Sequence, residues 1–120
     1  MPDCQHEFPE FPSFDRRKIE ANFEGGDVSS DGGLMLLRQA DRRLGLTAAL
    51  DKSLKDPRRP ELITHRQIDL LRQRIFGIAQ GYEDLNDHDT LRNDLVWQTA
   101  VERDSELASS PTLCRLENRA

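Results

Sequence analysis

The sequence predicts a mainly α-helical domain, and three observations support this prediction. Apolar residues recur every three or four positions along most of the chain after residue 30, which is the period of a helix with one buried face. Gly45 and Gly81 follow two of these runs, as residues that can adopt the left-handed conformation that closes a helix. Strand-like alternation is confined to a short stretch near the amino terminus. We therefore expect four to five helices preceded by one short β-hairpin.

The composition indicates one small domain with a modest core. The chain has 120 residues, of which 36% are hydrophobic and 32% are charged, and its formal net charge is -5. This acidic balance argues against a module that coats nucleic acid nonspecifically, because such modules are usually basic. A local basic patch on an acidic surface is still compatible with these totals.

Cysteine usage and hydropathy indicate a cytoplasmic protein that does not enter a membrane. Cys4 and Cys114 are too few and too far apart for a disulfide framework, which favours a reducing compartment. No apolar run approaches the roughly 20 residues needed to span a bilayer. The amino terminus also lacks the apolar core of a secretion signal.

Residues 1–18 are expected to form an extended arm that ends in a basic link. Pro2, Pro9 and Pro12 prevent a regular helix there, and three phenylalanines lie between or after them. The phenylalanines can dock on a partner along one side of a polyproline-like turn. A tail without fixed structure is an equally good interpretation of the same residues.

The hairpin is expected over residues 19–29. Apolar and polar residues alternate from Ile19 to Glu24, Gly25-Gly26 is a turn signal, and a short returning strand follows. A lone hairpin is barely stable in water, so it should lean on the helices. Residues 19–109 are therefore expected to form one helical domain that includes this hairpin.

Two helices should follow the hairpin. Ser29 or Ser30 caps the first, which opens at Asp31 and ends at Gly45. Thr47 caps a short second helix. The residues expected to be buried are Leu34, Leu37, Ala40 and Leu44 on the first helix, and Leu50 and Leu54 on the second.

The stretch from Thr64 to Asn93 is expected to hold the central helix. Thr64 and Gln67 have the spacing of a capping box, and Gly81 ends the helix. The residues at helical spacing on its main face are Ile68, Leu71, Ile75, Ile78 and Ala79. A second face is apolar or small, and it is formed by Leu70, Phe76 and Gly77.

The chain should end in two further helices. Asp94 caps the first, over residues 95–101, and Ser110-Pro111 opens the second with proline near its favoured first position. Leu113 and Leu116 on the last helix have no later element to pack against. Residues 110–120 are therefore expected to begin a helix that leads to a missing catalytic domain.

An acidic cluster with His88 follows Gly81, and it has two interpretations. Carboxylates suit magnesium or manganese, but the cluster of Glu83, Asp84, Asp87 and Asp89 matches no known metal-loop spacing. The favoured interpretation is structural: Asp84 or Asp87 caps the next helix, and other acids pair with Arg72, Arg74 or Arg92. We assign no metal ligand and no catalytic residue.

Several basic clusters are candidates for contacts to DNA phosphates, which are usually bound by arginines, lysines, hydroxyls and helix amino termini. An ordinary solvated face is the alternative for each cluster. The candidates are Arg16, Arg17, Lys18, Arg38, Arg42, Arg43, Lys55, Arg58, Arg59, Arg66, Arg74, Thr112 and Arg115.

Three sequence blocks, in order, resemble one known family. They are FEGGDVSSDGGLMLLRQADRRLGL at 23–46, RQRIFGIAQGYEDLNDHDTLRND at 72–94 and SSPTLCRLEN at 109–118. Together they resemble the amino-terminal region of bacterial insertion-sequence transposases of the DDE group 1 family. The resemblance covers roughly residues 23–118.

The resemblance implies a role in DNA transposition. It places the catalytic acids beyond Asn118, on a downstream core that uses magnesium or manganese, so no cofactor is expected in this chain. The expected partners are the terminal inverted repeats of the element, the remainder of the transposase and a second copy of the chain.

Two other functions compete with DNA binding. The first is a protein interaction module that dimerises through Leu70 and Phe76, or clamps the catalytic domain, without touching DNA. The net charge of -5 and the two-faced central helix favour it. The second is an independent metal nuclease built on Asp84 and Asp87, for which we expect no cleavage activity.

Overall fold

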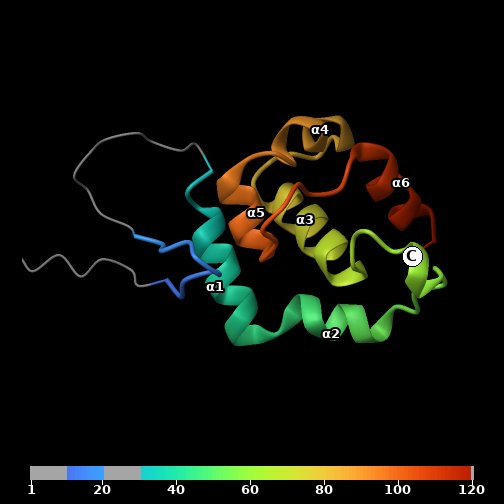
Figure 1. The fold of residues 1–120 in the computed structure, drawn as a ribbon, viewed down its shortest axis with the longest axis horizontal. Helices are drawn as coiled ribbons and strands as arrows, with labels where there is room; N and C mark the ends of the chain where they lie inside the picture. Colours follow the sequence, from blue (N-terminus) through green and yellow to red (C-terminus); the bar gives the residue numbers. More distant parts are fainter. Residues whose placement is uncertain (1–10, 21–30, 120) are drawn as a thin grey trace, which may run out of the picture.

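The computed structural model describes residues 11–20 and 31–119, which fold into a mainly helical domain (Figure 1). The mainly α prediction is confirmed, although six α-helices replace the expected four or five within these ranges. Two 3-10 helices, η1 and η2, join them. The elements are α1 (Leu34–Leu44), α2 (Leu46–Ser53), η1 (Pro60–Leu62), α3 (Gln67–Ala79), η2 (Leu85–Asp87), α4 (His88–Leu91), α5 (Leu95–Val101) and α6 (Ser110–Arg119).

The expected hairpin is not confirmed. Most of residues 19–29 lie outside the described residues, and so do the proposed caps Ser29 and Ser30. Within residues 11–20 and 31–119 the only β-type pairing is an isolated antiparallel bridge between Phe14 and Arg17. The Arg17 guanidinium donates to Thr99 Oγ1 at 3.0 Å and to Gln98 Oε1 at 3.1 Å, so this segment is attached to α5.

Helix α3 lies at the centre of the domain and contacts α2, α5 and α6 (Figure 1). Two groups of buried apolar side chains pack along it. The first group is Leu34, Phe76, Leu91, Trp97, Ala100, Val101 and Leu107. The second group is Leu70, Leu71, Ala108, Leu113 and Leu116.

The second face of α3 is the more deeply buried one, contrary to the expectation. Leu70, Phe76 and Gly77 are buried, whereas Ile78 on the expected main face is 52% exposed. The reason is that polar residues fill part of the interior. Gln73 is only 1% exposed, so the buried surface of α3 does not coincide with its apolar stripe.

Helix α3 begins at Gln67 rather than at Thr64, so the predicted capping box is wrong. Arg66 occupies the cap position, and no side chain caps the helix. The Gln67 amide instead donates to the Leu54 carbonyl at 2.9 Å and to Asp51 Oδ1 at 3.1 Å. This side chain therefore joins the start of α3 to the end of α2.

Helix α1 ends at Gly45 as predicted, because Gly45 adopts a left-handed conformation with φ of 66°. Its expected buried stripe is partly wrong, since Ala40 and Leu44 are exposed. Arg38 takes the inner position and is 2% exposed. Its guanidinium donates to Glu102 Oε1 at 3.2 Å and to the Pro12 carbonyl at 2.5 Å, which satisfies the buried charge.

Thr47 lies within α2 and does not cap it. Its backbone N–H and its hydroxyl donate to the Asp41 carboxylate at 2.9 and 2.5 Å. The pair holds the corner between α1 and α2.

A buried carboxylate ties the start of α1 to the centre of the domain. Asp31 accepts hydrogen bonds from the Tyr82 hydroxyl at 2.9 Å and from Trp97 Nε1 at 3.2 Å. The Trp97 ring also meets the rings of Tyr82 and His88 edge to face, each with centroids 5.8 Å apart. Trp97 on α5 is thus buried, and Asp94 caps this helix as predicted by accepting from the Val96 N–H at 2.8 Å.

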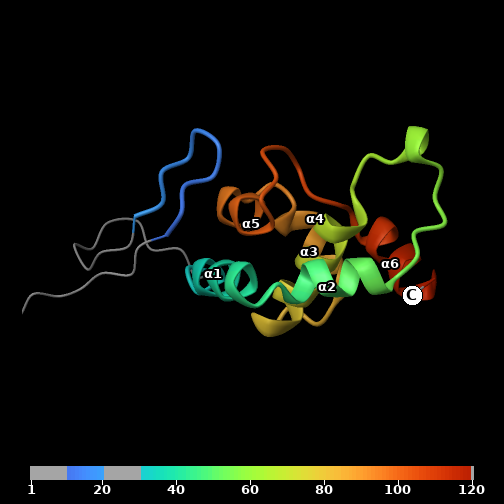
Figure 2. The ribbon, with the colours of Figure 1, turned by 90° about the horizontal axis from the view of Figure 1, so that it is seen from below.

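The last helix, α6, packs its two leucines into the core. Leu113 and Leu116 are buried in the same cluster as Leu70 and Leu71, so the expectation that they lack partners is wrong. The loop between α2 and α3, residues 54–66, lies beside α6 in both ribbon views (Figures 1 and 2). In the described part of the chain, no helix is both long and apolar enough to cross a membrane.

We expect Gly77→Ala to destabilise the domain, because a Cβ at Gly77 would lie 2.8 Å from His88 Cε1 and Nε2. His88 is completely buried against Trp97 and has little room to move. The overpacking should outweigh the helix propensity gained, with a net loss of about 1–2 kcal/mol in the free energy of unfolding. Urea unfolding measures this loss.

The control is a double-mutant cycle with His88→Ala. In the His88→Ala background, Gly77→Ala should become neutral or stabilising. An equal loss in both backgrounds would show that contact with His88 is not the cause.

We expect the domain to lose stability in mild acid because of His88. Burial, and secondarily Arg74, lowers the pKa of His88, although Asp87, Asp89 and Glu117 act in the opposite direction. Below about pH 6.5 the unfolded chain therefore binds a proton that the folded chain excludes. The free energy of unfolding should fall as the pH drops from about 6.5 toward the folded-state pKa.

Urea unfolding at several pH values above about 5 tests this prediction while the carboxylates stay ionised. His88→Gln should reduce the slope of stability against pH. Burial also lowers the pKa of His65, so His65→Gln is the matched comparison and should reduce the slope by its own share. A slope that His88→Gln leaves unchanged would contradict the assignment.

Candidate nucleic-acid interface

A basic wall is formed by the loop between α2 and α3. Asp56 accepts from the Arg58 backbone N–H at 3.1 Å, from Arg58 Nε at 2.9 Å and from Arg58 Nη2 at 2.7 Å. These hydrogen bonds lower the pKa of Asp56 to about 2. Arg58 Nη1 also donates to the His65 carbonyl at 2.8 Å, so the guanidinium is held in one place. Arg59 beside it is exposed.

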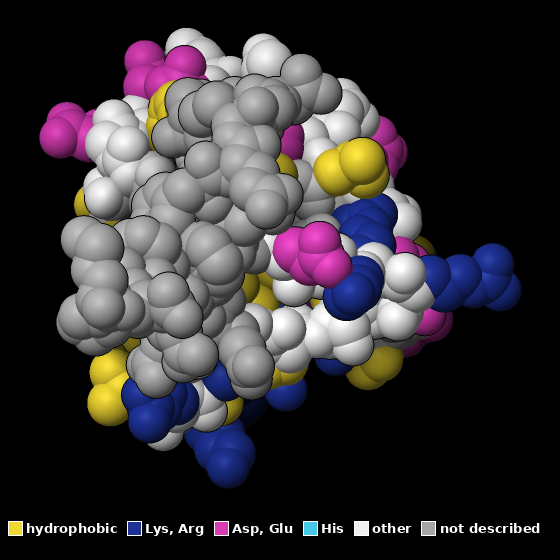
Figure 3. Space-filling model, turned by 90° about the vertical axis from the view of Figure 1, so that its left-hand side faces the viewer, with side chains coloured by type: hydrophobic (Ala, Val, Ile, Leu, Met, Phe, Trp, Pro, Cys, Tyr) yellow, Lys and Arg dark blue, Asp and Glu magenta, His cyan; other side chains and the backbone are white. Residues whose placement is uncertain are grey.

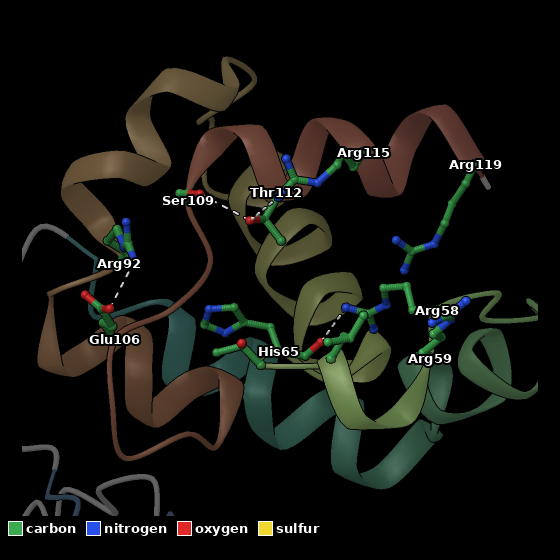
Figure 4. Close-up of a pocket in the computed structure, with 11 residues that line it drawn as sticks. Arg58, Arg59, His65, Arg92, Glu106, Ser109, Thr112, Arg115 and Arg119 are labelled. Carbon is green, nitrogen blue, oxygen red and sulfur yellow. Dashed lines mark hydrogen bonds and ion pairs between the residues drawn. The ribbon is translucent and has the colours of Figure 1, made fainter.

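The opposite wall is formed by α6. Asp89 accepts from the Ser110 N–H and hydroxyl, both at 2.8 Å, which fixes where the helix starts. Leu113 and Leu116 are buried and fix its rotation. Thr112, Arg115 and Arg119 are three and four residues apart and therefore share the face that is turned to the loop (Figure 4).

The end of the space between these walls is closed by Arg92 and Glu106. Arg92 Nη2 lies 3.2 Å from Glu106 Oε1, and Arg92 Nε donates to the Leu107 carbonyl at 3.1 Å. Burial, Arg103 and Arg92 lower the pKa of the neighbouring His65, while Asp69 and Glu106 act in the opposite direction.

The walls enclose a pocket of about 540 Å³ that is rich in arginine (Figure 4). Among the described residues, its lining contains five arginines, three hydroxyl side chains and one acid, Glu106. The lining residues are Arg58, Arg59, Leu62, Thr64, His65, Arg92, Glu106, Ser109, Thr112, Arg115 and Arg119. Figure 3 shows the opposite end of the molecule, where the basic and acidic side chains that are drawn lie interspersed. Such a pocket is chemically suited to phosphate or another anion.

The structure brings together four of the DNA-contact candidates, Arg58, Arg59, Thr112 and Arg115. Arg92 and Arg119 also line the pocket and were missed as candidates. The spacing of Arg115 and Arg119 was a usable signal for Arg119, because residues four apart share a helix face. No local pattern indicated Arg92.

Most other candidates are engaged within the protein. Arg38 is buried, so it is withdrawn as a phosphate contact. Arg17 bonds to α5, and Arg42 pairs with Glu102 at 2.6 Å. Paired side chains are also found at Lys18 with Glu20, Arg66 with Asp69 and Arg74 with Glu117. Arg16, Arg43 and Lys55 are exposed and lie outside the pocket.

Two acids of the cluster after Gly81, Asp84 and Asp89, have the structural role that was favoured from the sequence. Asp84 caps η2 by accepting from the Asn86 N–H at 3.3 Å, and Asp89 holds the start of α6. The arginines expected to pair with this cluster form ion pairs with other acids. Arg72 pairs with Asp41 and Glu102, Arg74 with Glu117, and Arg92 with Glu106.

These acids do not fit a metal centre. Within residues 11–20 and 31–119, no group of three or more His, Cys, Asp or Glu side chains is arranged to hold a metal ion. These described residues therefore offer no ligand set for a divalent ion.

The described residues thus form a helical domain with an arginine-rich pocket between the α2–α3 loop and α6. The model of a protein family described as transposase DDE domain group 1 matches residues 11–120. The chain therefore belongs to this transposase family, which gives it a role related to transposition. No curated protein and no solved structure shows a significant match to the chain.

Proposed function

We propose that this chain binds the DNA at the ends of the mobile element through the arginine pocket, and that it positions the downstream catalytic core of the transposase. The observation that carries the proposal is the convergence of Arg58 and Arg59 from the loop with Arg115 and Arg119 from α6. In a chain with a net charge of -5, five arginines line this pocket, which gives the local concentration of positive charge that holding a phosphate backbone requires.

The pocket is suited to contacts with the sugar-phosphate backbone of DNA rather than to recognition of its base sequence. Its walls present guanidinium groups and hydroxyls, which are the groups that proteins use on phosphates. Arg59 and Arg115 are exposed and make few contacts within the protein, so both are free to turn toward a ligand. Recognition of the terminal inverted repeats would then need further contacts outside the pocket.

The rival proposal was dimerisation through an exposed apolar face of α3, and the structure does not provide that face. Leu70 and Phe76 are buried inside a single copy of the chain. They cannot contact a second copy unless the domain unfolds. The two-faced character of α3 is explained by its central position in the fold.

We expect binding to an element-end duplex to depend steeply on salt. Each arginine that contacts a phosphate contributes about one unit to the slope of log K against log salt. Arg59→Gln and Arg115→Gln should each lower the steepness of the slope by about one unit. Fluorescence anisotropy at a series of salt concentrations measures it.

The matched control for these variants is Arg43→Gln, which removes the same charge outside the pocket. It should leave the slope unchanged. A failure of the unmodified chain to bind at low salt would overturn the proposal, and so would equal slopes for all three variants.

Glu106→Gln should tighten DNA binding. Among the residues that the structure describes, Glu106 is the only acid that lines the pocket. It pairs with Arg92 at 3.2 Å, so its charge offsets one arginine and repels phosphate. Removing this charge should lower Kd by roughly twofold to fivefold, the range expected for one exposed ion pair. Glu83→Gln makes the same change in net charge at an exposed site outside the pocket. Equal tightening by both variants would argue against a local effect.

A further inference from the structure

The loop end of the pocket contains two arginines that meet at one carboxylate. Arg58 holds Asp56 through three hydrogen bonds of 2.7 to 3.1 Å. Arg119 reaches from α6 toward Arg58 on the loop (Figure 4). Its Nη2 lies 3.8 Å from Asp56 Oδ1. That separation is too long for a hydrogen bond. Arg119 thus lies next to Asp56, whose carboxylate is already hydrogen-bonded to Arg58.

Arg119 has hydrogen-bonding capacity that the described residues do not use. Its Nε and Nη2 atoms are buried and have no hydrogen-bond partner there. Unpaired buried donors are unfavourable, and charged ones more so. The side chain is therefore poised for an acceptor that comes from outside the domain.

The charges of Arg58, Arg119 and Asp56 together favour the binding of an anion. Burial and then repulsion by Arg58 lower the pKa of Arg119, while attraction by Asp56 is the weakest of these influences. Because Arg58 already pairs with Asp56 through three hydrogen bonds, the guanidinium of Arg119 adds a second positive charge beside this one carboxylate.

The neighbouring side chains suit a tetrahedral oxyanion. Arg59 lies next to Arg58 on the loop, and Arg115 lies one turn before Arg119 on α6, so donors approach from both walls (Figure 4). Guanidinium groups pair with phosphate through two parallel hydrogen bonds, which a single ammonium cannot reproduce.

We propose that Arg58 and Arg119 form a discrete site for one phosphate group. This inference rests on the proposed function, because in the complex with DNA the occupant is a phosphate of the bound strand. The site is defined by groups that are already in place, so it should also take inorganic phosphate in the absence of DNA.

The first test is a titration of the whole chain with inorganic phosphate. Calorimetry and the shift in Tm measure the binding. The unmodified chain should bind phosphate, and Arg119→Gln should weaken binding about tenfold or more, because it removes a charged, buried donor pair. Arg119→Lys should recover only part of the affinity. Arg43→Gln should bind as the unmodified chain does.

Two outcomes of this titration would overturn the site. One is that the unmodified chain does not bind phosphate. The other is that Arg119→Gln and the unmodified chain bind it equally well. The Tm of each variant without phosphate shows that the fold is intact, and Arg119 lies at the end of α6 where its loss should leave the core unchanged.

The second test identifies the source of the phosphate with two duplexes of identical sequence, one with 5′-hydroxyl ends and one with 5′-phosphate ends. If Arg119→Gln weakens binding of both duplexes equally, the occupant is a backbone phosphate. If it weakens only the phosphorylated duplex, the occupant is a strand-terminal phosphate. Either outcome supports a phosphate site.

The two proposals fail in different ways. If Arg59→Gln and Arg115→Gln weaken DNA binding while Arg119→Gln changes neither DNA nor phosphate binding, the Arg58–Arg119 site is wrong and the proposed function stands. If phosphate binds and depends on Arg119 but no duplex binds at low salt, the site stands and the proposed function is wrong.

Discussion

A buried side-chain amide positions the second half of the domain. Gln73 on α3 donates to the Ala108 carbonyl at 2.9 Å and accepts from the Ala108 N–H at 3.0 Å, so it pairs with that backbone unit on both sides. Its Nε2 also lies 3.3 Å from His88 Nδ1. An irregular segment thus gains in the interior the hydrogen bonds that a strand would supply. Because α6 begins two residues later, the direction of Arg115 and Arg119 depends on this amide.

The helical architecture could be read from the sequence wherever a local rule decides it. Gly45 ends α1 and Asp94 caps α5, because left-handed closure and capping depend on residues within one turn. The buried faces were less accessible. Arg38 and Gln73 are interior residues whose partners, Glu102 and Ala108, lie far away in the sequence, so no periodicity of apolar residues could place them.

The candidate site shows the same division. Arg58, Arg59, Thr112 and Arg115 could be listed from local basic clusters, but their assembly into one pocket depends on how the loop packs beside α6. Composition cannot distinguish Arg38, which is buried and bonded to Glu102, from Arg59, which is exposed. Arg92 joins the pocket only because residues 102–109 return past α4 and place Glu106 and Leu107 against it.

The two walls of the pocket have a consequence for stability. The loop arginines and those of α6 are separated by about half the chain, so an unfolded chain of net charge -5 presents no comparable concentration of positive charge. An anion held between the walls binds the folded chain alone and therefore shifts the folding equilibrium toward it by mass action. The ligand would act as a removable cross-link, so the apparent melting temperature of the domain would record how much of the protein is occupied.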